Sequence, residues 1–203
     1  MPSKFRKSYV CYYDGQQEKM YFEHFAKLIK ENFSNSTVDF EEVKKLKVLS
    51  KLSTNIPKIA VFDYDNKPKE FECKVKTNGV EPIYTSLNFD LWLLLHKKKF
   101  SKSILNNDDY QAEIRKEYRL GDTDNIKKYE NIKKILNQIN LEDIERAIKN
   151  ANEIMNAKLE DDKIKIIKGK KPFYYYDNPS MNIHNFFEKL LGEIAKNGAK
   201  DGR

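Results

Sequence analysis

With 203 residues, the chain is long enough for one domain with a substantial hydrophobic core. Its 38 Lys and Arg against 31 Asp and Glu give a net charge of +7, which fits a nucleic-acid partner but also a lysine-rich surface without one. The apolar run at 91–95 has five residues, against roughly 20 in a membrane-spanning helix, so no membrane span is expected. The chain has two cysteines and no CxxC pair, which argues against a disulfide framework or a zinc site. The N-terminal sequence shows no signal-peptide pattern, so the cytoplasm is the expected location.

Residues 1–100 alternate between strand-like and helix-like patterns. Strands are predicted at 8–13, 37–43, 58–65 and 81–86. Helices are predicted at 14–33, at 69–79 and from Asn88 onward, with Asn88 as an N-cap. The run from Ile59 to Phe62 is apolar without alternation, which is typical of a parallel strand covered on both faces. The βαβα order therefore predicts an α/β fold with a parallel sheet flanked by helices.

Residues 101–203 are predicted to be mostly helical and to pack on this core, within one domain overall. Apolar residues repeat with helical spacing along 139–159. A further helix is predicted at 181–195, with Ser180 as its N-cap. The broad apolar face of this helix could dock a partner, although a place in the protein's own core is the more common use of such a face. It consists of Phe186, Phe187, Leu190 and Leu191.

Two acids end the third predicted strand, in the stretch Asp63-Tyr64-Asp65. In an extended segment, residues two positions apart point the same way, so Asp63 and Asp65 can share a hard divalent cation such as Mg²⁺. The alternative is a turn, since Asp and Asn are common loop residues. The residues themselves leave both interpretations open.

Asp14 and Asp90 are further candidate ligands. Asp14 follows the first predicted strand and precedes a helix, and ligands of parallel sheets bind beyond the carboxyl ends of the strands. Asp14-Gly15 is also a common turn dipeptide. Asp90 is expected in the first turn of its helix, where an acid stabilises the helix dipole whether or not it binds a metal. No GxSxG, P-loop, HExxH or GxGxxG motif is present, so a nucleophilic Ser or Cys has no support.

An acid followed by glycine after the first strand, then DxD after the third, resembles the TOPRIM domain, the metal-binding α/β module of topoisomerases, primases and several nucleases. Three longer stretches resemble the RloB-like family more specifically. "DGQQEKMYFEHF" resembles its "EG…E…YF" opening, "TSLNFDLWLLLHKKKF" its "S…FE-WLLLH" signature, and "DNPSMNIHNFFEKL" its C-terminal "NPS" segment and helix. The resemblance spans most of the chain.

This resemblance implies a TOPRIM-like core at 1–100, in which Asp63 and Asp65 are the metal ligands of the DxD pattern. It places Asp14 at the family's motif glutamate and Asp90 at the glutamate of "FE-WLLLH". Both residues are one methylene shorter than glutamate. Because catalytic geometry tolerates displacements of about 0.5 Å, either the backbone compensates for the shorter reach or activity is weakened.

RloB-like proteins are associated with phage defence and are commonly encoded beside an ABC-type or OLD-like ATPase. The resemblance therefore implies an abortive-infection effector with an ATPase partner. The preferred hypothesis is a nuclease dependent on Mg²⁺ or Mn²⁺, with the four aspartates as ligands and Asp14 alternatively as the proton-transfer group. RNA, tRNA in particular, is favoured over DNA because related effectors cleave it.

Substrate phosphates are expected to contact basic residues near the acids. Lys97, Lys98 and Lys99 form the nearest basic cluster in sequence, and Lys171 belongs to a second cluster at 165–171. A solvated helix end is the alternative for the first cluster. The rival function is a catalytically weak or inactive subunit that binds and regulates an ATPase. The oligomeric state stays open, a homo-oligomer included.

Overall fold

A computed structural model describes residues 5–65, 67–100, 107–159, 165–168, 173–175 and 178–198. Four parallel strands form one sheet in the order β2-β1-β3-β4. The strands are β1 Phe5–Tyr13, β2 Ser36–Glu42, β3 Lys58–Tyr64 and β4 Glu81–Ser86. The predicted α/β class and all four predicted strands are confirmed, and the first strand begins earlier than predicted, at Phe5.

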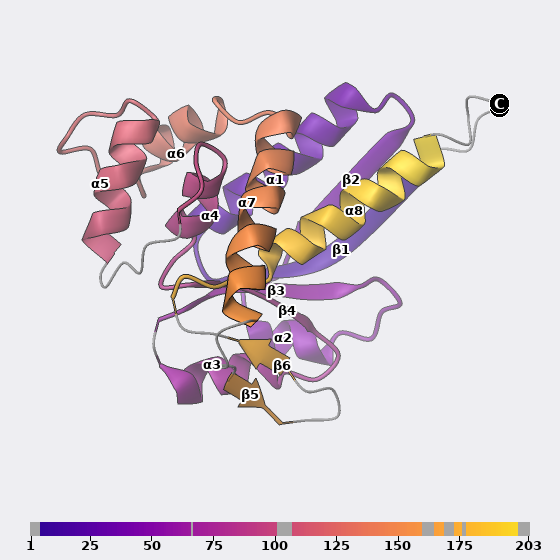
Figure 1. Cartoon of the computed structure of the whole chain (residues 1–203). Helices are drawn as coiled ribbons and strands as arrows, with labels where there is room; N and C mark the ends of the chain where they lie inside the picture. The colour runs from indigo at the N-terminus through magenta and orange to yellow at the C-terminus, as the bar shows by residue number, and fades with distance from the viewer. Residues whose placement is uncertain are drawn as a thin grey trace.

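Helices cover both faces of the sheet (Figure 1). One face packs on α1 Gln16–Asn32 and α8 Ile183–Gly198, and the other on α2 Leu46–Lys51 and α3 Pro68–Val75. The side chains of β3 alternate between two hydrophobic clusters, with Ile59 and Val61 in one and Ala60 and Phe62 in the other. This alternation explains why the strand is apolar throughout, as its sequence predicts.

The second half of the chain is mostly helical, as predicted. It contains α5 Asn107–Glu117, α6 Tyr129–Leu136 and α7 Leu141–Leu159, followed by a hairpin of β5 Lys165–Ile167 and β6 Phe173–Tyr175. Helix α4 Asp90–Leu95 packs against α5 and α7, and every residue of α4 is buried. Among the described residues, none of the helices combines the length and apolarity needed to cross a bilayer.

The apolar face of α8 belongs to the core. Phe187 and Leu190 are almost fully buried, and Phe186 stacks edge-on against Tyr9 of β1. The intramolecular interpretation of this face is therefore confirmed. The predicted N-cap of α8 is wrong, because α8 begins at Ile183 and the backbone N–H of Ser180 donates to Ser86 Oγ at 2.8 Å instead. The chain before α8 thus runs along the end of β4.

Candidate functional site

The carboxyl ends of β1 and β3 bring the predicted acids to one edge of the sheet. These strands are neighbours, with Tyr13 paired to Val61, and the Asp14 N–H donates to the Val61 carbonyl at 3.0 Å. A pocket of about 400 Å³ opens at this edge. Its lining includes Asp14, Gln17, Glu18, Asp63, Asp65 and Lys127. The predicted convergence of Asp14 with the Asp63/Asp65 pair is therefore found.

Glu18 is an acid of this site that the sequence reasoning missed. It lies in the first turn of α1 and is 4% exposed. Burial, together with the charges of Asp14 and Asp90, raises its pKa to about 7 against the opposing effect of Lys127. The signal for Glu18 was present in the quoted "EG…E" pattern, whose second acid follows the first by one helical turn.

Asp63 lies at the end of β3 with its side chain partly exposed to the pocket. Burial raises its pKa well above the usual range, and the charges of Glu18, Asp65 and Asp90 act in the same direction. The Thr85 hydroxyl opposes this rise by donating to Asp63 Oδ1 at 3.0 Å. Asp65 is exposed at the rim of the pocket. Asp63 is thus the centre of the negative charge.

Asp90 lies behind the pocket rather than on its lining. It is 0% exposed, and neither carboxylate oxygen has a hydrogen-bond partner in the described part of the chain. Burial raises its pKa to about 6 against the charge of Lys127 and the nearby amide of Gln17, whose Nε2 lies close but not in hydrogen-bonding geometry. An unpaired buried carboxylate is costly, so its oxygens call for a bound cation or water.

The turn between β4 and α4 places Asp90 in this position. Leu87 adopts a left-handed conformation, with φ of 61°, which is uncommon for a residue other than glycine. Asn88 Oδ1 then accepts the backbone N–H of Asp90 at 3.0 Å. The predicted N-cap at Asn88 is wrong by one residue, because Phe89 takes the N-cap position and Asn88 binds the first helical N–H from one residue earlier. Strained backbone such as that of Leu87 often accompanies functional sites.

Asp14, which follows β1, is exposed. Its Oδ1 accepts a hydrogen bond from the Tyr12 hydroxyl at 2.8 Å, and its Oδ2 pairs with the ammonium of Lys74 on α3. Lys74 therefore offsets the charge of Asp14 at the rim, whereas Glu18 is the buried carboxylate on this side of the site.

The lysines proposed from sequence lie elsewhere. Lys97 Nζ donates to the Gln138 carbonyl at 3.0 Å, Lys98 pairs with two glutamates of α5, and Lys99 pairs with Glu153 of α7 at 2.8 Å. None of the three lines the pocket, and their role in substrate binding stays a prediction. Lys171 lies outside the described residues.

Lys127 is the cation that lines the pocket. It belongs to the connection between α5 and α6, and its side chain is exposed. Within the described ranges its ammonium makes no hydrogen bond or ion pair, so it is available for an anion. No sequence motif marks Lys127, because the fold alone brings this loop to the acids.

The donor set suits a hard divalent cation. As they stand, no three His, Cys, Asp or Glu side chains of the described residues are close enough together to enclose one ion. Mg²⁺, however, usually keeps several waters and takes only one or two carboxylates plus substrate phosphate. The unpartnered oxygens of Asp90 and the raised pKa values of Glu18 and Asp63 indicate that their ionised forms are disfavoured here unless a cation accompanies them. The residues therefore fit such an ion.

Comparison with known proteins gives one match. A family model described as RloB-like protein matches residues 9–190. No curated protein and no solved structure matches the chain. The matched region runs from β1 into α8 and includes every acid of the pocket, Asp90 behind it and Lys127.

Proposed function

The chain belongs to the RloB-like family, and we propose that it is a metal-dependent nuclease that hydrolyses phosphodiester bonds at the carboxylate cluster. The observation that carries this proposal is the gathering of Glu18, Asp63 and Asp90 at one edge of the sheet, where the charges of Glu18 and Asp90 raise the pKa of Asp63 and the charge of Asp90 raises that of Glu18. Burying like charges together is unfavourable unless protons or a cation neutralise them. A divalent cation is the neutraliser that also serves phosphoryl chemistry.

Glu18 and Asp63 are the proposed main ligands, with Asp65 and Asp14 completing the site from the rim. When bound, Mg²⁺ or Mn²⁺ supplies a water of lowered pKa and stabilises charge on the phosphate oxygens. Asp90 keeps the site electronegative from behind. Because Lys127 lines the pocket together with the acids, it is the proposed contact for a substrate phosphate.

Glu18 can compensate for the shortened acid at position 14. The family pattern has glutamate where this chain has Asp14, and the side chain of Asp14 is one methylene shorter, so its carboxylate extends less far toward a bound metal. Glu18 provides a full-length carboxylate on the same side, one helical turn further along the chain. The parallel sheet, with acid-Gly after β1 and the two aspartates at the end of β3, supports a TOPRIM-like arrangement of these groups.

The biological setting is proposed from the family resemblance. On this proposal the protein acts in the cytoplasm as a toxic effector of anti-phage defence, together with a partner ATPase, and its substrate is RNA, tRNA in particular, rather than DNA. The alternative is a regulatory subunit without catalysis. The ion pair of Asp14 with Lys74 favours this alternative, because it engages a proposed ligand in a contact within the protein.

The deciding experiment incubates purified protein with tRNA, other RNA, and single- and double-stranded DNA, in Mg²⁺, in Mn²⁺ and in EDTA, with and without the neighbouring ATPase. Metal-dependent cleavage that is lost in Asp63→Asn and Glu18→Gln, but retained in a Lys128→Ala control, supports the nuclease. Absence of cleavage in every condition, with defence in cells unaffected by Asp63→Asn, would instead establish the regulatory subunit.

A further inference from the structure

Helix α4 links the carboxylate site to the helical half of the protein. Its first residue is Asp90, and all six of its residues are buried. Such a short helix has little stability of its own, because most of its backbone groups lie in the terminal turns. The position of Asp90 therefore depends on what holds the other end of α4.

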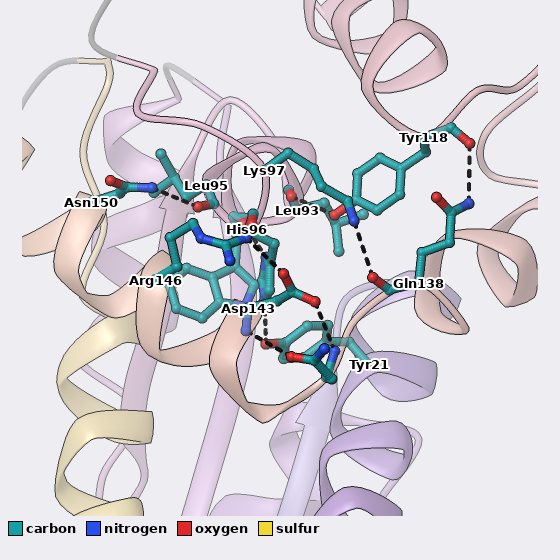
Figure 2. Close-up of polar contacts among 12 residues, drawn as sticks. Tyr21, Leu93, Leu95, His96, Lys97, Tyr118, Gln138, Asp143, Arg146 and Asn150 are labelled. Atoms are coloured by element: carbon teal, nitrogen blue, oxygen red, sulfur yellow. Dashed lines mark hydrogen bonds and ion pairs between the residues drawn. The ribbon is translucent and has the colours of Figure 1, made fainter.

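Side chains from the helical half bind the carbonyls at that end (Figure 2). The Tyr118 hydroxyl donates to the Leu93 carbonyl at 2.7 Å. Asn150 of α7 donates from Nδ2 to the Leu95 carbonyl at 2.8 Å. The Leu93 carbonyl also accepts the His96 N–H at 3.3 Å, so Tyr118 adds a second bond there, whereas Leu95 lies in the last turn, where carbonyls lack a partner within the helix.

Arg146 of α7 binds the last of these carbonyls. Its Nη1 donates to the His96 carbonyl at 2.8 Å and to Asp143 Oδ1 at 2.7 Å. Asp143 is itself fixed, because its Oδ2 accepts the backbone N–H of Asn140 and its own N–H donates back to the Asn140 side chain. Arg146 thus holds a defined position, and its charge favourably faces the C-terminal end of α4.

His96 completes the arrangement from the side of α1. The Trp92 carbonyl can only accept, so His96 Nδ1 carries the proton and donates to it at 2.9 Å. Burial lowers the pKa of His96 to about 4, so the ring is neutral and Nε2 accepts from the Tyr21 hydroxyl at 2.8 Å. Tyr21 lies one turn after Glu18 on α1, so α1 supports both the acid cluster and the far end of α4.

We propose that Arg146 and Asn150 are positioning residues of the nuclease site, which act through α4 to hold Asp90 against Glu18 and Asp63. This inference rests on the proposed metal-dependent function. Asp90 lies at one end of a two-turn rod and the two α7 contacts at the other, so a shift at the C-terminal carbonyls moves the carboxylate. Within the described part of the chain, helix α7 contributes no residue to the pocket lining, yet on this proposal it affects the metal affinity of the site through α4.

The test measures Mn²⁺ affinity by calorimetry for Arg146→Ala and Asn150→Ala. Each should weaken binding about tenfold, as loss of groups that orient a metal site commonly does. Asn32→Ala is the matched control, because Asn32 Nδ2 caps the Leu28 carbonyl at the end of α1 with the same chemistry. Its Mn²⁺ affinity should equal that of the wild type.

A double-mutant cycle separates positioning from general damage. In an Asp90→Asn background, Arg146→Ala should cause no further loss of Mn²⁺ affinity, because its effect passes through the Asp90 carboxylate. An equal tenfold loss in that background would overturn the inference. The inference would also be overturned if both single variants kept their Mn²⁺ affinity while hydrogen exchange showed that the amides of α4 had become less protected.

Arg146→Lys covers the case in which the alanine variants do not fold. Lysine keeps the charge and one hydrogen bond, so the Mn²⁺ affinity of Arg146→Lys should lie between those of wild type and Arg146→Ala. Wild-type Mn²⁺ affinity in both Arg146→Lys and Asn150→Ala counts against the inference. Failure of wild-type protein to bind Mn²⁺ is a different result. It refutes the proposed function, and this inference falls with it.

Discussion

The carboxylate of Glu18 lies so close to Gly15 that a Cβ added at Gly15 would come within 2.6 Å of Glu18 Oε2. The backbone of Gly15 is extended, with φ of −143°, so its conformation suits any residue and the requirement for glycine is one of space. The glycine of the acid-Gly pattern therefore leaves room for an acid of the site.

Gly15→Ala should displace this carboxylate while sparing the fold. The contacted atom is the end of a side chain that can move, so the free energy of unfolding in urea should change by less than about 1 kcal/mol. Affinity for Mn²⁺ should fall roughly tenfold, because Glu18 can no longer take its position. Calorimetry checks the second point. Wild-type affinity in a folded Gly15→Ala protein would show that Glu18 is not a ligand.

The stability of the metal-free protein should fall as the pH rises from about 5 to about 7.5. Folding raises the pKa of Glu18 from 4.5 to about 7 and that of Asp90 from 3.8 to about 6. Between these values the folded protein binds more protons than the unfolded chain, so raising the pH favours unfolding. Urea unfolding in EDTA at four pH values measures the slope.

Glu18→Gln supplies the control for this pH effect. Its amide does not titrate, so the decline in stability should be shallower than in the wild type. Added Mn²⁺ should oppose the wild-type decline, since ionised carboxylates bind the metal. A slope in EDTA that is identical in the two proteins would mean that Glu18 is not the titrating group.

Lys127→Ala should reduce cleavage without affecting the fold. Lys127 is exposed on the pocket wall, so its loss should change the free energy of unfolding by no more than about 0.5 kcal/mol. The kcat/KM for nucleic acid should fall roughly tenfold, which corresponds to about 1.4 kcal/mol of lost phosphate binding. Its sequence neighbour Lys128 is also exposed but is absent from the pocket lining, so Lys128→Ala should behave as wild type.

Tyr21→Phe should destabilise the protein by roughly 1–3 kcal/mol, because it leaves His96 Nε2 buried without its donor. Both side chains are 0% exposed, so water does not readily replace the hydroxyl. Tyr129→Phe is the control, since Tyr129 is 52% exposed and should lose almost nothing. Urea unfolding measures both. An unchanged midpoint for Tyr21→Phe would contradict the assigned hydrogen bond.

Local patterns in the sequence were sufficient for the sheet and for part of the site. Uninterrupted apolar runs that end in acids identify parallel strands, and the βαβα order brings their carboxyl ends to one edge. The convergence of Asp14 with Asp63 and Asp65 follows from these two facts alone. The same patterns do not reveal how deeply a side chain is buried, so they do not distinguish the exposed Asp14 from the buried Glu18.

Only the tertiary structure decided which charges act together. The lysines at 97–99 follow Asp90 in sequence, but the helical half pairs them with carbonyls and acids of its own. Lys127, far along the chain, reaches the pocket instead. Local patterns identify the strands, whereas the pairing of β1 with β3, which are not consecutive in sequence, is a tertiary contact. Burial and the coupling of charges depend on contacts between distant residues, which form only when the helices pack on the sheet.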